Sequence, residues 1–146
     1  PEPRQLARPR APDTLEREAE HSMTSETTAT ILYIEDNHAN QMLVRLILER
    51  RPGVRLVTAD TGAGGLQEAW QERPALILLD ISLPDMNGYA VLAALRSHPD
   101  TKEVPVVAIS GDLPKTPSTA GFARYLSKPI EIAPLFQALD DFLPRS

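Results

Sequence analysis

Residues 75–79, with the sequence ALILL, are apolar at every position, and Asp80 follows them directly. A short apolar run of this kind predicts a buried β-strand. Because the run has no polar alternation, both faces of the strand are expected to be covered, as in parallel sheets that carry helices on each side. The run therefore predicts an α/β domain in which Asp80 stands at the end of a central strand.

Outward from this strand, short apolar segments alternate with segments of helical periodicity. Further strands are expected at residues 31–34, 54–58, 105–109 and 123–126. Helices are expected between Asn40 and Pro52 and at residues 66–72, 89–97 and 132–142. Glycine is a poor helix former, so Gly62, Gly64 and Gly65 are expected to weaken the start of the second helix. The alternation predicts a doubly wound, five-stranded parallel sheet.

The chain has two parts of different composition. Residues 1–29 contain four of the 14 prolines and only two large aliphatic residues, Leu6 and Leu15. Such a segment buries too little apolar surface to offset the entropy of ordering it, so a disordered linker or tail is expected there. Residues 30–146 hold nearly all the aliphatic side chains and are expected to form one folded domain.

Composition excludes several classes of function. The 146-residue chain has no cysteine, which rules out a disulfide scaffold and a thiolate metal site. Its formal net charge of −5 argues against binding to nucleic acid, which favours a basic surface. No apolar run is long enough to cross a bilayer. We therefore expect a soluble cytoplasmic domain that contacts neither nucleic acid nor a membrane.

Polar residues follow the expected strands, where parallel sheets bind their ligands. They are Glu35, Asp36, Asp80, Ser110, Asp112 and Lys128. Three neighbouring carboxylates repel one another, and a hard cation such as Mg²⁺ relieves that repulsion with oxygen ligands. A cation, a lysine and a hydroxyl together suit a phosphoryl group. One carboxylate could also accept that group covalently.

Four motifs occur in order along the chain: residues 31–37 (ILYIEDN), residues 78–88 (LLDISLPDMNG), Ser110, and residues 125–129 (YLSKP). In sequence and spacing they resemble the receiver domain of two-component response regulators. The resemblance covers residues 30–146 and is strongest to receivers at the carboxyl end of hybrid sensor histidine kinases. It implies the flavodoxin-like receiver fold and a phosphoacceptor signalling domain rather than an enzyme. It also implies a histidine kinase or a histidine phosphotransfer domain as phosphodonor.

The resemblance implies a role for each matching residue around the phosphoacceptor. Asp80 would accept the phosphoryl group. Asp36 and Asp80 would bind Mg²⁺ together with the backbone carbonyl of Ser82, and Glu35 would act mainly through a water bound to the metal.

Three further residues would respond to the phosphoryl group. Ser110 would donate a hydrogen bond to a phosphoryl oxygen, and Lys128 would form a salt bridge to it. Tyr125 would change rotamer on phosphorylation. Pro129 follows Lys128, and that peptide bond is commonly cis in the family.

One interval departs from the family pattern. Lys128 follows Ser110 by 18 positions, which is shorter than usual. Residues 111–121 contain two prolines and two glycines, so a long helix is not expected there. We therefore expect a shortened or absent fourth helix, which puts in doubt the face that many relatives use to dimerise. The oligomeric state stays open.

Alternative functions are a pseudo-receiver that binds partners without phosphorylation and a phosphatase of the aspartyl-phosphate type. The intact set of acids, hydroxyl and lysine favours a phosphorylated receiver over the first. The phosphatase would have a second aspartate two residues after the nucleophile, where this chain has Ser82. The parent protein is expected to be a hybrid kinase, and a stand-alone regulator that starts near Met23 is the alternative.

Overall fold

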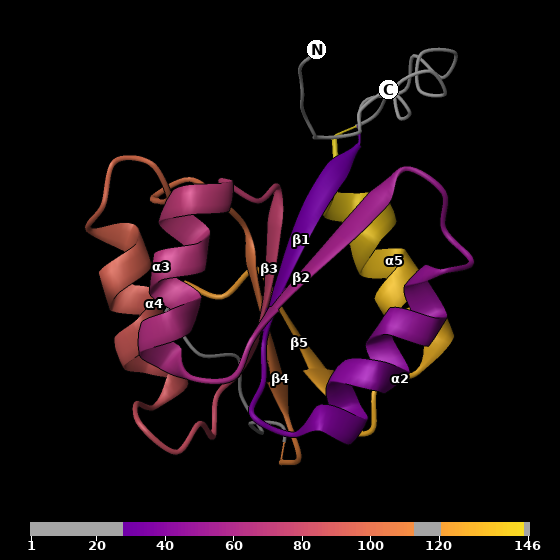
Figure 1. The fold of residues 1–146 in the computed structure, drawn as a ribbon, viewed down its shortest axis with the longest axis horizontal. Coiled ribbons are helices and arrows are strands. Elements are labelled where there is room, and N and C mark those ends of the chain that lie inside the picture. Colours follow the sequence, from indigo (N-terminus) through magenta and orange to yellow (C-terminus); the bar gives the residue numbers. More distant parts are fainter. Residues whose placement is uncertain (1–27, 113–120, 145–146) are drawn as a thin grey trace, which may run out of the picture.

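The computed structural model describes residues 28–112 and 121–144, and the linker expected at residues 1–29 lies almost entirely outside them. The strands are β1 (Ala29–Ile34), β2 (Val54–Ala59), β3 (Leu76–Asp80), β4 (Val106–Ser110) and β5 (Arg124–Ser127). They form one parallel sheet in the order β2-β1-β3-β4-β5 (Figure 1). This confirms the predicted five-stranded parallel sheet.

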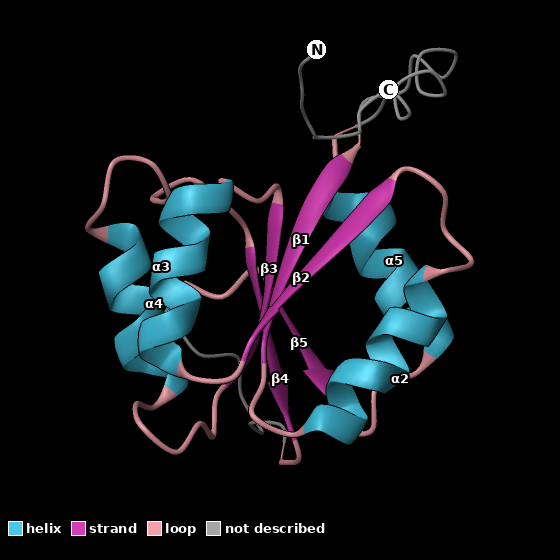
Figure 2. Ribbon diagram, in the orientation of Figure 1, coloured by secondary structure: helices cyan, strands magenta, loops and turns pink. Residues whose placement is uncertain are grey.

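Helices cover both faces of the sheet, as the all-apolar strands predicted. Within the described residues there are four: α2 (His38–Leu48), α3 (Gly62–Glu72), α4 (Gly88–Arg96) and α5 (Ile132–Phe142). Figure 2 shows α3 and α4 on one side of the strands and α2 and α5 on the other. Two separate apolar clusters fill these layers, and every residue of β3 is buried between them.

The start of α3 differs from the prediction that its glycines would weaken it. The helix begins at Gly62 rather than at Leu66. The Thr61 hydroxyl accepts a hydrogen bond from the Gly64 N–H at 2.9 Å and so caps the helix. A Cβ at Gly65 would lie 2.5 Å from Cδ1 of Ile34, so glycine lets the helix approach β1 closely. Packing between helix and sheet therefore outweighs the low helix propensity.

The interval predicted to have a shortened fourth helix joins β4 to β5. Residues 113–120 of that interval lie outside the described residues. On either side of them, the described residues 111–112 and 121–123 contain no helix.

The order of the strands brings the connection after β1 next to the connection after β3. After β1 the chain moves to one edge of the sheet through α2 and β2, and after β3 it moves to the other edge. The carboxyl ends of β1 and β3 therefore meet where the direction of winding reverses, which is where doubly wound sheets bind ligands.

Candidate functional site

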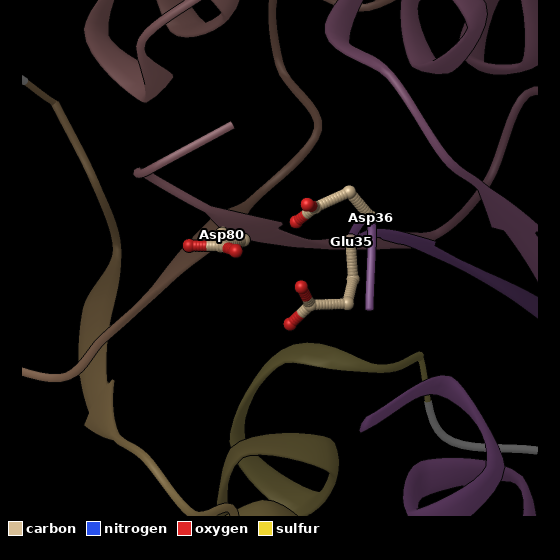
Figure 3. A group of neighbouring side chains, drawn as sticks. All are labelled: Glu35, Asp36 and Asp80. Atoms are coloured by element: carbon tan, nitrogen blue, oxygen red, sulfur yellow. The ribbon is translucent and has the colours of Figure 1, made fainter. Parts of the chain in front are cut away.

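Three carboxylates meet at the carboxyl ends of β1 and β3. Glu35 and Asp36 directly follow β1, and Asp80 is the last residue of β3. Figure 3 shows Glu35 and Asp36 side by side, with Asp80 across from them. One oxygen from each carboxylate lies within 4.8 Å of the others. Glu35 and Asp80 are each 1% exposed, whereas Asp36 is exposed to solvent.

The carboxylate of Glu35 accepts hydrogen bonds from three residues close to it in the sequence. The Tyr33 hydroxyl donates to Oε1 at 3.0 Å, the Asn37 backbone N–H to Oε2 at 3.1 Å, and the Asn40 amide to Oε1 at 3.2 Å. Burial raises the pKa of Glu35, although the Asn37 N–H and the charge of Lys128 act in the opposite direction. Burial and the nearby Glu35 charge also raise the pKa of Tyr33, so its hydroxyl stays a donor.

Lys128 connects the two buried carboxylates. Its Nζ lies 3.0 Å from Oδ2 of Asp80 and 3.2 Å from Oε1 of Glu35. Burial alone lowers the pKa of Lys128, but the hydrogen bond and charge of Asp80, together with Glu35, outweigh it and leave the pKa raised. The other Asp80 oxygen, Oδ1, accepts from the Ser82 backbone N–H at 2.9 Å. Asp80 is therefore held at both oxygens.

The backbone at Lys128 is held by the end of the sheet. Its N–H donates to the Ser110 carbonyl at 2.9 Å, which continues the pairing of β4 with β5. The peptide bond between Lys128 and Pro129 is cis, as the resemblance implied. The ammonium therefore reaches the carboxylates from the far side of β4.

Ser110 and Tyr125 lie near this group without contacting its carboxylates. The Ser110 hydroxyl donates to the Asp112 carbonyl at 2.9 Å and accepts from the Asp112 N–H at 3.1 Å. The Tyr125 ring packs edge-on against Phe122, with ring centres 5.5 Å apart. Its hydroxyl is buried and has no hydrogen-bond partner in the part of the chain that the structure describes.

Sequence reasoning missed the residues that hold Glu35 in place. Tyr33 and Asn40 stand two residues before and five residues after it, and both contact the same oxygen. Gln41 also donates from its side-chain amide to the Glu35 carbonyl at 2.6 Å. A buried polar tip on an otherwise apolar strand was the available signal, because a buried tyrosine hydroxyl needs a partner.

Comparison with known proteins identifies the family of the chain. The sequence model of the response regulator receiver domain matches residues 31–140, most of the described chain. The chain belongs to the response regulator receiver family. Receiver domains are signalling phosphoacceptor domains of two-component systems, so this is the broad role of the chain.

Individual receivers resemble the chain over most of its length. The polar-differentiation response regulator DivK of Brucella ovis is 28% identical over 120 residues, which cover 80% of this chain and 97% of DivK. A CheY-like receiver domain from Methylobacillus flagellatus is 29% identical, with a TM-score of 0.72 and coverage of 80% and 99%.

One similar receiver contains a metal. The receiver domain of the sensor histidine kinase PA1611 from Pseudomonas aeruginosa PAO1 is 28% identical, with a TM-score of 0.71. The match covers 80% of this chain and 98% of that domain, whose crystal structure has a magnesium ion coordinated in the active-site cleft. In the present chain, none of the helices within residues 28–112 and 121–144 has the length and apolar character needed to cross a membrane.

Proposed function

We propose that Asp80 accepts a phosphoryl group from a phosphohistidine and that the aspartyl phosphate changes the conformation of the domain. A carboxylate oxygen of Asp80 forms the new bond to phosphorus. The bond between phosphorus and the imidazole nitrogen breaks, and its electron pair stays on the imidazole. The donor is a histidine kinase or a histidine phosphotransfer domain, the partners that receivers use.

The observation that carries this proposal is the way Asp80 is held. Its carboxylate is buried at the end of the central strand, next to a lysine at 3.0 Å and two further acids. Lys128 has three donors, and two of them reach Asp80 and Glu35. These are the two partners of the ammonium among the described residues, and its third N–H would bind a phosphoryl oxygen.

The donor set fits Mg²⁺, because all three side chains offer hard oxygen ligands and a common centre. Asp36, Asp80 and the backbone carbonyl of Ser82 would hold the ion, with Glu35 in its outer shell. Bound there, Mg²⁺ would neutralise charge on the phosphoryl oxygens. The magnesium ion in the similar Pseudomonas receiver supports this assignment.

Ser110 and Tyr125 are proposed to report the phosphorylated state. To donate to a phosphoryl oxygen, the Ser110 hydroxyl must give up its bond to the Asp112 carbonyl. The buried Tyr125 hydroxyl has no hydrogen-bond partner among the described residues, so a change of its rotamer would break no hydrogen bond to them.

The setting of the domain is also a proposal. We assign residues 30–146 to the receiver and residues 1–29 to a linker within a hybrid sensor histidine kinase located in the cytoplasm. Similarity to the receiver of a sensor histidine kinase supports this setting. Similarity to DivK, a response regulator that this chain matches over nearly its whole length, supports a stand-alone regulator instead. Sequencing the reading frame upstream of Pro1 decides between them.

Phosphorylation is tested with acetyl phosphate and intact-mass spectrometry. The wild-type chain is expected to gain the mass of one phosphoryl group with Mg²⁺ and not with EDTA, and Asp80→Asn is expected to gain none. Asp60 directly follows β2, so it lies at the carboxyl end of a strand as Asp80 does. Asp60→Asn is therefore a matched control that should still be modified. Equal modification of wild type and Asp80→Asn, or none in wild type with Mg²⁺, would contradict the proposal and favour a phosphorylation-independent binding module.

A further inference from the structure

The connection from β3 to α4, residues 81–87, is fastened at both of its ends. The Ser82 N–H donates to Asp80, and Ser82 also pairs with Asn87 across the connection in an isolated antiparallel bridge. Asn87 in turn caps α4 by accepting from the Ala90 N–H at 2.9 Å. These bonds shape the connection and join it to β3 and α4, and the Ile81 N–H also donates to the Ile109 carbonyl of β4 at 3.2 Å.

Asp85 supplies a tie from this connection to a neighbouring helix. Its Oδ1 accepts from the Gly62 N–H at 2.8 Å, and its Oδ2 accepts from the Ala63 N–H at 3.1 Å. Gly62 and Ala63 are the first two residues of α3, whose N–H groups have no partner within the helix. These two bonds hold the pKa of the Asp85 carboxyl below its usual range, so it is charged at neutral pH.

Two side chains therefore cap the same helix in different ways. Thr61 precedes α3 directly and satisfies the Gly64 N–H, so its bond stays local to the helix. Asp85 lies 23 residues away from Gly62 along the chain, so its bonds join α3 to the connection that contains Ser82. The bonds of Asp85 therefore do more than cap α3, because they also hold residues 81–87 against it.

We propose that Asp85 is a positioning residue for the metal site, holding the Ser82 carbonyl where Mg²⁺ needs it. The inference rests on the proposed function, because it assumes Mg²⁺ bound by Asp36, Asp80 and Ser82. Buried Leu83 and the partly buried Met86 attach the connection to the apolar core. Apolar contacts of this kind do not fix hydrogen-bond geometry, whereas the two bonds of Asp85 hold the middle of the connection against α3, and the Ser82–Asn87 bridge links that part to Ser82.

The test measures Mg²⁺ affinity by isothermal titration calorimetry and folding stability by thermal melts in EDTA. Asp85→Ala is expected to weaken Mg²⁺ binding about tenfold, the usual effect of removing a partner that orients a metal ligand. Asp85→Asn keeps an acceptor oxygen and is expected to lose less. Thr61→Ala is the matched control, because it also removes a cap of α3 and should lower the melting temperature without changing Mg²⁺ affinity.

A salt series separates positioning from simple charge attraction. Asp85 is exposed, so any long-range attraction of its charge for Mg²⁺ is screened at high ionic strength. A loss of affinity that persists in about 0.5 M KCl supports positioning, because the Debye length has then shrunk to a few ångströms. A loss that vanishes there overturns it.

Two further outcomes also overturn the inference, and they are distinguishable. If wild type binds Mg²⁺ and Asp85→Ala binds it equally well, or if Thr61→Ala loses as much affinity, only the role of Asp85 is wrong. If wild type binds no Mg²⁺ at all, the metal site of the proposed function is wrong and the role of Asp85 is wrong with it. Should Asp85→Ala fail to fold, Asp85→Asn takes its place, with a smaller but measurable loss of Mg²⁺ affinity expected, and unchanged affinity in Asp85→Asn then overturns the inference.

Discussion

Lys128 offsets the electrostatic repulsion between the two buried carboxylates of Glu35 and Asp80. Glu35 and Asp80 are both almost fully buried, and the lysine Nζ lies within 3.2 Å of an oxygen of each. Removing one partner of a buried ion pair costs more than the pair itself contributes, because the remaining charges lose their compensation. The ammonium therefore stabilises the domain as well as serving the proposed phosphoryl site.

Replacing Lys128 with methionine is expected to lower the free energy of unfolding at pH 7 by about 2 kcal/mol. That figure lies below the usual range for a fully buried pair, because the lysine side chain is 28% exposed and partly screened. Urea denaturation measures the change, and exposed Lys102→Met is the matched control.

The loss of unfolding free energy caused by Lys128→Met should become smaller as the pH falls. The pKa of Glu35 is raised in the folded protein, so Glu35 destabilises the fold when charged, and this effect disappears as Glu35 takes up a proton. Lys128→Met raises that pKa further, so the difference in stability between variant and wild type narrows on acidification. A difference that stays constant or widens between pH 7 and pH 5 would contradict the role given to Lys128.

The sequence placed the acids and the lysine at one edge of the sheet, and the structure brings Glu35, Asp80 and Lys128 into contact there. Sequence patterns did not predict which residues donate hydrogen bonds to these acids. Tyr33 looks like an ordinary strand residue until β1 is seen to end at Ile34, with the Tyr33 hydroxyl bonded to the carboxylate of Glu35. Which residue becomes a donor depends on where each side chain points at the carboxyl ends of the strands. The neighbouring sequence does not specify that direction.

At the scale of elements, caps and contacts with neighbours decide where helices begin. α2 starts at His38 because the Asn37 side chain accepts from the Asn40 N–H, two residues earlier than the periodicity suggested. α3 starts at Gly62 despite three glycines, because Gly65 packs on Ile34. Strand positions, in contrast, follow from the apolar runs and agree with the prediction to within a residue or two. Helix ends are harder to predict because they depend on local caps and on packing against distant strands as well as on periodicity.

Gly65→Ala tests the close contact between α3 and β1. The added Cβ would lie 2.5 to 2.9 Å from three side-chain carbons of Ile34, and both residues are buried. Overpacking of this kind costs about 1–3 kcal/mol, which exceeds the gain of about 1 kcal/mol in helix propensity. A net loss of stability in urea denaturation is expected.

Gly64→Ala in the same helix is the control for Gly65→Ala. Its Cβ would meet only the Thr61 hydroxyl, at 3.0 Å, so stability is expected to stay the same or rise. Equal effects of the two substitutions would show that propensity, rather than packing on Ile34, governs the start of α3.

At the scale of the whole molecule, the order of the strands creates the site. Glu35 and Asp80 are separated by α2, β2 and α3 in sequence, yet β1 and β3 are neighbours in the sheet. Any doubly wound sheet with this order brings the ends of these two strands together, which is why the site could be expected before its contacts were known. The ties that position the site, such as Asp85 on α3, depend instead on how separate connections meet.

Mg²⁺ is expected to stabilise the whole domain by mass action, because it binds only the folded arrangement of acids. An ion present at 100 times its dissociation constant adds about 2.7 kcal/mol to the free energy of unfolding. Thermal melts in EDTA and in millimolar MgCl₂, at matched ionic strength, measure this shift. Asp36→Ala should abolish most of it and should raise the melting temperature in EDTA, because one of three mutually repelling charges has gone. Exposed Glu103 precedes β4, at the opposite edge of the sheet, so Glu103→Ala should keep the full Mg²⁺ response. An unchanged wild-type melt in Mg²⁺ would show that the three acids form no metal site and that Lys128 and hydrogen bonds stabilise Glu35 and Asp80.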